Sequence, residues 1–454
     1  MKKNVLFLAL ILSVSSLTMA QTFNSAIEED VAAPLPSVGR SIVRNWNDDF
    51  VFSYHSDGVK STFVCTKVSD FSSPYYAAGP NIDEYYYHIP ISPSIWINDI
   101  KIVKDYAFFC GWEVISPSLS IGIIGAIYLP DFIMGTFNYH YHQILQTLEL
   151  KQMVAYDNGG RYKVVAIGTK QLPSLSSNNC AVEIDDPQNP SPSNYDYRDF
   201  YSSATYSEFI NDIVCTDHTI TFVGVIISST NGYYPSYRAS ADKSAVLSDP
   251  SFDILHVMPY SFESSGIHPQ AVHLKKNLIA VSYLHDDGTG SFSSRLRVID
   301  VASNINTNSQ EMSIDLKDEP IELAYSSEED QMALLHHLLN LTGGTSQFSF
   351  WHPFATISYY ADITYYSKPF YSIDIFRKTN LVSTGGNLWY LQDMLSFSNR
   401  SCPPLTSRKI QIIAPLNINS YTIPVSAPSF FTIPQTPTGS SMRNALLLNC
   451  STSN

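Results

Sequence analysis

The chain has 454 residues, with 27 Lys and Arg against 41 Asp and Glu, and a formal net charge of −14. A surface this acidic repels phosphate backbones, so we expect no nucleic-acid partner. Only 15% of the residues are charged, whereas 29 are Tyr and 24 are Phe. This composition suits strands better than exposed helices and indicates an all-β protein.

The N-terminus has the pattern of a cleaved signal peptide over residues 1–20. Lys2 and Lys3 precede an apolar run over 5–14, and small residues lead up to Ala20. The run is too short to span a bilayer, and no later run is long enough. We therefore expect an exported mature chain, whether periplasmic, outer-surface or secreted, with no integral membrane segment. Residues 21–40 are polar and contain Pro, which indicates a linker.

A sequence repeat follows. The string Ile-Asn-Asp-Ile at 97–100 returns at 210–213, and Gly111 returns as Gly224, an offset of 113. Gly168, which ends another apolar run, lies about halfway between the two glycines. Such a repeat, with a step near 55 residues, indicates stacked supersecondary modules.

Short apolar runs separated by turns mark the strands within each unit. Hairpins are predicted for 50–54 with 61–66 and for 152–156 with 163–168, and further strands continue the step at 278–282, 332–335 and 388–391. A capped helix over 326–341 is the rival interpretation of one segment, but the repeat register favours a strand there.

Units of three or four short strands cannot bury both faces alone, so they must stack on neighbours. Radial stacking gives a β-propeller, and a pair of β-sandwiches is the main alternative. We predict one propeller over residues 41–454 with seven blades, six or eight being the alternatives. A strand from near the C-terminus is expected to complete the first blade, followed by a tail.

Two repeated features have mainly structural interpretations. The pairs Asn98-Asp99 and Asn211-Asp212 are expected to bond nearby backbone at a bend, the alternative being contact with a ligand or metal. Gly111, Gly168 and Gly224 suit close backbone packing between neighbouring blades.

Six cysteines are present. Three lie in strand-like runs and are expected to be buried, whereas Cys180, Cys402 and Cys450 fall in predicted loops or the tail. Any disulfide is expected among these last three.

No common catalytic string is found: there is no G-x-S-x-G, no H-E-x-x-H and no Gly-rich loop ending in Lys-Ser or Lys-Thr. An active site assembled from separate blades stays open, and no cofactor is predicted. His140 and His142 fall on one face of a predicted strand, where two imidazoles could bind one metal. A solvent-facing strand explains them equally.

Tyrosines gather in the predicted loop over 185–208 and in another near 233. Tyr195, Tyr197, Tyr201, Tyr233 and Tyr234 are candidate ligand-binding residues, because Tyr offers a rigid apolar ring with a hydrogen-bonding tip. The alternative is that these rings pack between blades.

The repeated Ile-Asn-Asp-Ile, together with 106–112 and 121–128, resembles the uncharacterised exported β-propeller proteins of Bacteroidetes. The resemblance implies a propeller in the envelope or outside the cell, and it supplies no activity or catalytic residue that could be carried over. Our first hypothesis is a non-catalytic binding or assembly protein of the bacterial cell envelope, with Tyr-rich loops meeting a glycan or an envelope protein. The rival is a glycan-directed hydrolase or lyase with carboxylates and His near the propeller channel.

Overall fold

The computed structural model describes the chain in segments. These are residues 25–29, 38–44, 50–56, 61–67, 86–91, 94–133, 139–145, 147–170, 179–189, 194–200, 206–228, 232–258, 265–287, 289–314, 318–338, 346–366, 370–376, 380–384, 388–391, 405–414, 418–422 and 446–449. The predicted signal peptide and Tyr201 lie outside the described residues.

Consecutive strands pair antiparallel in groups of four along most of the chain. The first groups are β2 (Val38–Arg44), β3 (Phe50–Ser56), β4 (Ser61–Lys67) and β5 (Tyr86–Ile91); β6 (Ile95–Val103), β7 (Tyr106–Ser116), β8 (Leu119–Tyr128) and β9 (Tyr139–Ile144); and β10 (Thr147–Asn158), β11 (Arg161–Lys170), β12 (Asn179–Asp185) and β13 (Asn194–Asp199). Both predicted hairpins are confirmed, as β3 with β4 and β10 with β11.

The second half continues the pattern. Its strands are β14 (Tyr206–Cys215), β15 (Ile220–Ser228), β16 (Tyr233–Ser240) and β17 (Ile254–Val257); β18 (Ser265–Lys275), β19 (Leu278–Asp286), β20 (Phe292–Asp300) and β21 (Ile305–Ile314); β22 (Asp318–Ser326), β23 (Gln331–Leu338), β24 (Ser346–Trp351) and β25 (Tyr359–Tyr366); and β26 (Ser372–Phe376), β27 (Asn380–Thr384) and β28 (Leu388–Leu391). Strand β23 replaces the capped helix considered for 326–341, so the repeat register predicted this segment correctly. No helix in the described segments is long and apolar enough to cross a membrane.

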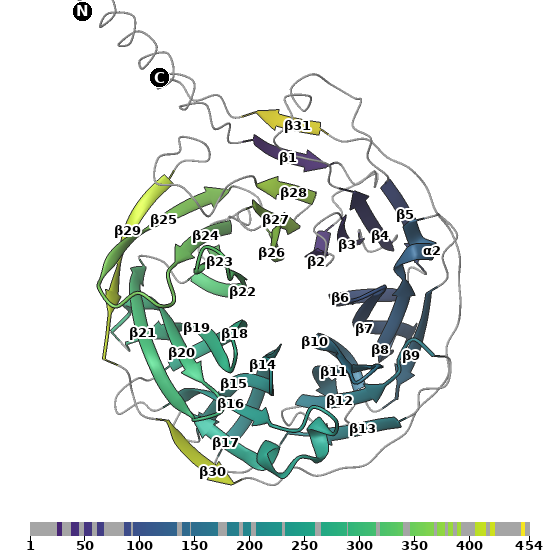
Figure 1. Ribbon diagram of the computed structural model, residues 1–454, viewed down its shortest axis with the longest axis horizontal. Helices are drawn as coiled ribbons and strands as arrows, with labels where there is room; N and C mark the ends of the chain where they lie inside the picture. Colours follow the sequence, from purple (N-terminus) through teal and green to yellow (C-terminus); the bar gives the residue numbers. More distant parts are fainter. Residues whose placement is uncertain are drawn as a thin grey trace, which may run out of the picture.

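The groups stand radially around a central opening, and the first strand of each group lies nearest to it (Figure 1). Each first strand contacts the first strand of the next group, and β2 contacts β26 as well as β6, which closes the ring. The chain is therefore a β-propeller. Strand β29 (Leu405–Ile412) bridges β21 and β25, and β16 touches β18, so hydrogen bonding merges several groups into one sheet. Seven blades stays our prediction.

The two ends of the chain meet in the last sheet. Strand β1 (Ser25–Glu29) pairs with β28, and β31 (Leu446–Asn449) pairs with the other edge of β1. Our expectation differs from this pairing in two respects. The stretch 21–40 contains β1 and the start of β2 and is not only a linker. The N-terminal strand joins the last group, whereas we expected a C-terminal strand to join the first.

Hydrophobic cores lie between the faces of neighbouring groups. One cluster joins Phe108 and Ile124 of β7 and β8 to Val164 and Val182 of β11 and β12. Another joins Leu296 of β20 to several residues of β23 and β24. Side chains that alternate along each strand therefore face two different neighbours, which explains why both faces are apolar.

The repeated glycines lie where two strands of one group approach closely. A Cβ on Gly111 would lie 1.8 Å from the carbonyl oxygen of Trp96, and one on Gly224 would lie 1.9 Å from that of Phe209. In each case the nearest atom belongs to the first strand of the same group. Our prediction of close packing was right, but it acts within a blade and not between blades.

The described cysteines are Cys110 and Cys180, which are buried, and Cys215, which is half-buried; all three are unpaired. Cys180 lies in β12 and not in a loop, which corrects our placement. The side chains of the other three cysteines lie outside the described residues.

Candidate functional site

A β-bulge recurs in the strands that surround the central opening. The register slips between Ile97 and Asp99 in β6, between Leu150 and Gln152 in β10, and between Ile210 and Asp212 in β14. The same slip precedes Gln270 in β18 and Glu322 in β22. A bulge adds one residue and re-aims the side chain that follows it. Carboxylates and amides thus alternate at one structural position over these five strands, whereas the same bulge in β2 precedes Ser41.

Each of the three carboxylates reaches the backbone of the next first strand. The N–H of Met153 donates to Asp99 Oδ2 at 2.9 Å, and that of Ala271 donates to Asp212 Oδ2 at 2.7 Å. The N–H of Ile373 donates to Glu322 Oε2 at 2.8 Å. These bonds join β6 to β10, β14 to β18 and β22 to β26. We call them the inter-blade clasps.

The repeated Asn-Asp pair therefore has the structural role that we favoured, but its bonds run further than expected. Asn98 Nδ2 donates to the carbonyl oxygen of Leu150 at 2.8 Å, so both members of the first pair bond the neighbouring strand β10. Asp212 also accepts the N–H of Ile213 at 2.7 Å, the local bond that we predicted.

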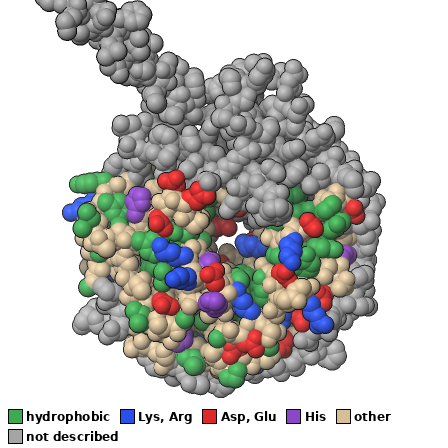
Figure 2. Space-filling view, in the orientation of Figure 1, with side chains coloured by type: hydrophobic (Ala, Val, Ile, Leu, Met, Phe, Trp, Pro, Cys, Tyr) green, Lys and Arg blue, Asp and Glu red, His purple; other side chains and the backbone are tan. Residues whose placement is uncertain are grey.

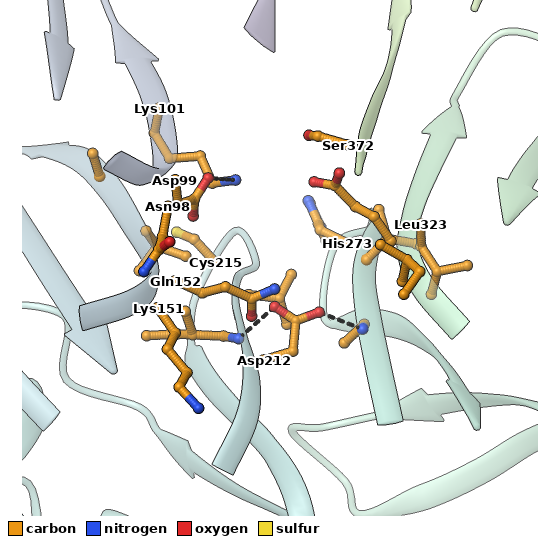
Figure 3. Close-up of a pocket in the computed structure, with 18 of the residues that line it drawn as sticks. Asn98, Asp99, Lys101, Lys151, Gln152, Asp212, Cys215, His273, Leu323 and Ser372 are labelled. Atoms are coloured by element: carbon orange, nitrogen blue, oxygen red, sulfur yellow. Dashed lines mark hydrogen bonds and ion pairs between the residues drawn. The ribbon is translucent and has the colours of Figure 1, made fainter. Parts of the chain in front are cut away.

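A cavity of about 320 Å³ occupies the centre of the ring. Basic and acidic side chains lie beside the opening in the part of Figure 2 that is coloured. The polar and charged residues that line the cavity come from six of the first strands or from segments next to them, and they include Asn98, Asp99, Lys101, Lys151, Gln152, Asp212, His273, Glu322 and Ser372. Figure 3 shows Asp99 and Lys101 facing the cavity from one side and Ser372 from the other.

Lys101 forms an ion pair with the first of these carboxylates, Asp99. Its Nζ lies 3.0 Å from Asp99 Oδ1, and its side chain keeps 37% exposure. Burial disfavours the ammonium form, but the attraction of Asp99 and of Glu322 outweighs it and raises the pKa of Lys101. The ammonium group therefore stays charged in the cavity.

Two of the carboxyl groups are poised to hold protons near neutral pH. Burial raises the pKa of Asp212 to about 7, and burial raises that of Glu322 to about 8. In both cases desolvation exceeds the stabilisation that the clasp and Lys101 give to the anion. The cavity thus offers hydrogen-bond donors, acceptors and an ammonium group together, which suits a ligand rich in hydroxyl groups.

Sequence reasoning did not identify Lys101, Glu322 or His273 as site residues. The available signal was the position after the bulge, since Asp99, Asp212 and Glu322 fall at nearly equal steps along the chain. Glu322 is preceded by Ile and not by Asn, so the repeated string gave no warning of it.

His140 and His142 lie in the outer strand β9, as predicted for one face of a strand. Their Nε2 atoms lie 3.1 Å and 2.9 Å from the same oxygen, the carbonyl of Pro187. Burial lowers the pKa of His142 to about 4, so this ring is neutral and can donate to that carbonyl. Among the described residues no group of three or more His, Cys, Asp or Glu is placed to hold a metal ion. The pair instead fastens the segment after β12.

The tyrosine candidates lie away from the central cavity. Tyr195 and Tyr197 belong to strand β13 and not to a loop, and Tyr197 is only 3% exposed within the core cluster that joins two blades. Tyr233 and Tyr234 are half-buried at the start of β16. None of these four described tyrosines lines the cavity. For Tyr195 and Tyr197 the packing alternative is therefore correct.

Comparisons with known proteins give distant likenesses only. No family model matches the chain, and no curated protein matches it. A streptogramin B lyase structure is 9% identical over 86% of this chain and 98% of its own, with a TM-score of 0.45. An α-L-arabinanase of Penicillium chrysogenum in complex with arabinobiose is 13% identical over 69% and 93%, with a TM-score of 0.41. A GH43_12 protein retrieved from a capybara gut metagenome is 10% identical over 86% and 99%, with a TM-score of 0.24. Values this low carry no conclusion about function, and the fold rests on the strand arrangement itself.

Proposed function

We propose that this protein is an exported, non-catalytic binding protein of the bacterial cell envelope whose ligand enters the central cavity. The observation that carries the proposal is the cavity of about 320 Å³ lined by carboxyl, amide and ammonium groups. Its size and polarity suit a small polyhydroxylated molecule such as the end of a glycan. We therefore propose the central cavity as the ligand site, in place of the Tyr-rich segments.

The existing bonds of the carboxylates favour binding over catalysis. Asp99 is engaged by Met153 and Lys101, and Asp212 by Ala271 and Ile213. Groups committed to holding neighbouring blades together are rigid, which preorganises the cavity wall for a ligand. The same commitment leaves them little freedom to act as nucleophile or base.

Thermal unfolding of the purified protein against a panel of oligosaccharides tests this function. A ligand that binds only the folded state stabilises it by about 2.7 kcal/mol at a hundred times Kd. The variant Lys101→Met removes the cavity ammonium, and Lys104→Met removes a surface lysine that is 58% exposed on the turn after the same strand. A rise in Tm for wild type and Lys104→Met that is lost in Lys101→Met supports the proposal. Absence of any rise, or an equal rise in both variants, contradicts it.

Glycan hydrolysis is the second candidate, and one specific observation favours it. Glu322, with a pKa raised by burial to about 8, and Asp99 line the same cavity together with His273. A protonated carboxylic acid opposite a carboxylate is the pairing that glycoside hydrolysis requires. Chromatography of any ligand that raises Tm decides the matter: breakdown that is lost in Glu322→Gln, with binding retained, identifies an enzyme. An intact ligand after long incubation identifies a binding protein.

A further inference from the structure

The interface between the β18–β21 group and the β22–β25 group is partly apolar and partly polar. Its apolar part is a core cluster that includes Leu284 and Leu296 from one side and Leu334 and Trp351 from the other. Because side chains alternate along a strand, residues two positions from these lie on the same facing surfaces. Those residues include several polar ones.

Buried polar atoms without a hydrogen-bond partner concentrate at this interface. Of sixteen such atoms among the described residues, six lie here. They are Gln270 Oε1, Ser282 Oγ, Ser294 Oγ, His336 Nδ1, Gln347 Oε1 and Gln347 Nε2. Gln270 is 8% exposed, and each of the other four residues is at most 1% exposed.

Strand register places these atoms on the two facing surfaces. Gln270 lies opposite Ser282 in the β18–β19 ladder, and Ser294 lies opposite Leu284 of the core cluster. On the other side, His336 lies opposite Gln347, two pairs along the ladder from the core residue Leu334 and on the same face. Directly opposed residues have Cβ atoms about 5 Å apart. Each of the two facing surfaces therefore carries a few polar side chains next to apolar ones.

Another buried glutamine, in the same two groups of strands, has hydrogen-bond partners for both ends of its amide. Gln310 in β21 is fully buried, donates to the carbonyl oxygen of His352 at 2.7 Å and accepts from the Tyr359 hydroxyl at 3.0 Å. Gln347, buried to the same degree, has no partner for either end of its amide within the described chain. Buried polar groups in native proteins almost always find a partner, in protein or in ordered water.

We propose that ordered water molecules bind between these two groups of strands and bridge Gln347 and His336 to Ser282, Ser294 and Gln270. Buried water typically makes about three hydrogen bonds to such groups. The amide of Gln347 and the serine hydroxyls supply both donors and acceptors. Burial lowers the pKa of His336 to about 3, so its ring is neutral and adds no charge to the site.

The hydrated interface begins at the wall of the central cavity. Ala271, the neighbour of Gln270, lines that cavity, and so does Leu323 from the facing strand β22. Leu323 also belongs to the apolar cluster of the interface. The water site is thus separate from the proposed ligand site but adjoins it.

The experiment counts long-lived internal waters by oxygen-17 magnetic relaxation dispersion and locates them in a high-resolution crystal structure. We compare wild type with Gln347→Met and with Gln310→Met as the matched control. The expected result is ordered water on Gln347 in the wild-type crystal, a loss of at least one long-lived water in Gln347→Met, and no loss in Gln310→Met. Ser282→Ala, a smaller change, serves as a second variant if Gln347→Met does not fold, and it is expected to lose water as well.

Three results would overturn the proposal. One is a wild-type crystal structure in which the amide of Gln347 bonds only protein atoms. Another is an unchanged count of long-lived waters in Gln347→Met, or in Ser282→Ala where that variant replaces it. The last is an equal loss of water in Gln310→Met, because that would trace the loss to general loosening of the fold.

Discussion

Asp99 Oδ2 in β6 accepts the backbone N–H of Met153 in β10 at 2.9 Å, and so ties two blades together beside the central cavity. Asp99→Ala leaves that buried N–H without a partner. We expect a loss of about 1–3 kcal/mol in unfolding free energy, the usual cost of an unsatisfied buried group. Denaturant unfolding checks this. Asp105→Ala, an exposed aspartate in the next turn, should change the free energy by less than about 0.5 kcal/mol.

Stability should fall as pH rises from about 5 to 7. Burial raises the pKa of Asp212 to about 7 and that of Glu322 to about 8, whereas both groups titrate near pH 4 in the unfolded chain. The folded state therefore binds more protons in this window, and each group contributes a slope of about −1.4 kcal/mol per pH unit. Urea midpoints measured across the window test this. The double variant Asp212→Asn with Glu322→Gln should show a flatter profile, and a wild-type profile equal to that of the variant contradicts the assignment.

Gly224→Ala should be far more damaging than Gly159→Ala. The new Cβ at 224 would lie 1.9 Å from the carbonyl oxygen of Phe209, a backbone atom that cannot move aside. At Gly159 nothing lies within 4 Å, although its φ of 65° carries a conformational cost of about 1–2 kcal/mol. We expect a loss of about 3 kcal/mol or more for the first variant. Thermal unfolding of both proteins provides the comparison, and equal shifts in Tm would contradict the close approach.

Removing one partner of the buried ion pair Arg238–Glu208 should destabilise the protein more than replacing both partners. Arg238 Nε and Nη2 bond the two carboxylate oxygens of Glu208 at 2.7 Å and 2.9 Å, and neither side chain is exposed. Glu208→Gln leaves an uncompensated guanidinium and should cost about 3–5 kcal/mol. Adding Arg238→Met should recover part of that loss. A double variant less stable than Glu208→Gln alone would show that the bond from Arg238 Nη1 to the carbonyl of Phe252, at 3.0 Å, matters more than the charge.

The period of the repeat was enough to predict a ring of antiparallel strands, because strand alternation and turn residues are local properties of the sequence. The offset of 113 between Asp99 and Asp212 also has a physical explanation. The residue after the bulge is Asp in β6, Gln in β10 and Asp again in β14, so the sequence of one blade most resembles that of the next blade but one. The cavity was not predictable in the same way. Lys101 and Glu322 lie more than 200 positions apart in the sequence, and only ring closure brings them together.

The tyrosines show a different limit of prediction from sequence. A segment rich in Pro and Tyr has the composition of a loop, yet 194–199 forms the outer strand β13 because β12 offers it an edge with matching register. Tyr197 then faces the neighbouring blade and not solvent. Composition reports the local preference of a segment, whereas its burial is decided by strands distant in the chain.

The pairing of β1 with β28 has a consequence for folding. Ala26 lies opposite Leu391, and Ser25 lies opposite Asn449 on the other edge of β1. Each hairpin can form from neighbouring residues, but both edges of β1 stay unpaired until β28 and β31, far along the chain, are available. Exposed strand edges in incomplete chains promote aggregation. A ring closed in this way therefore leaves one strand edge open to aggregation until its last blade forms.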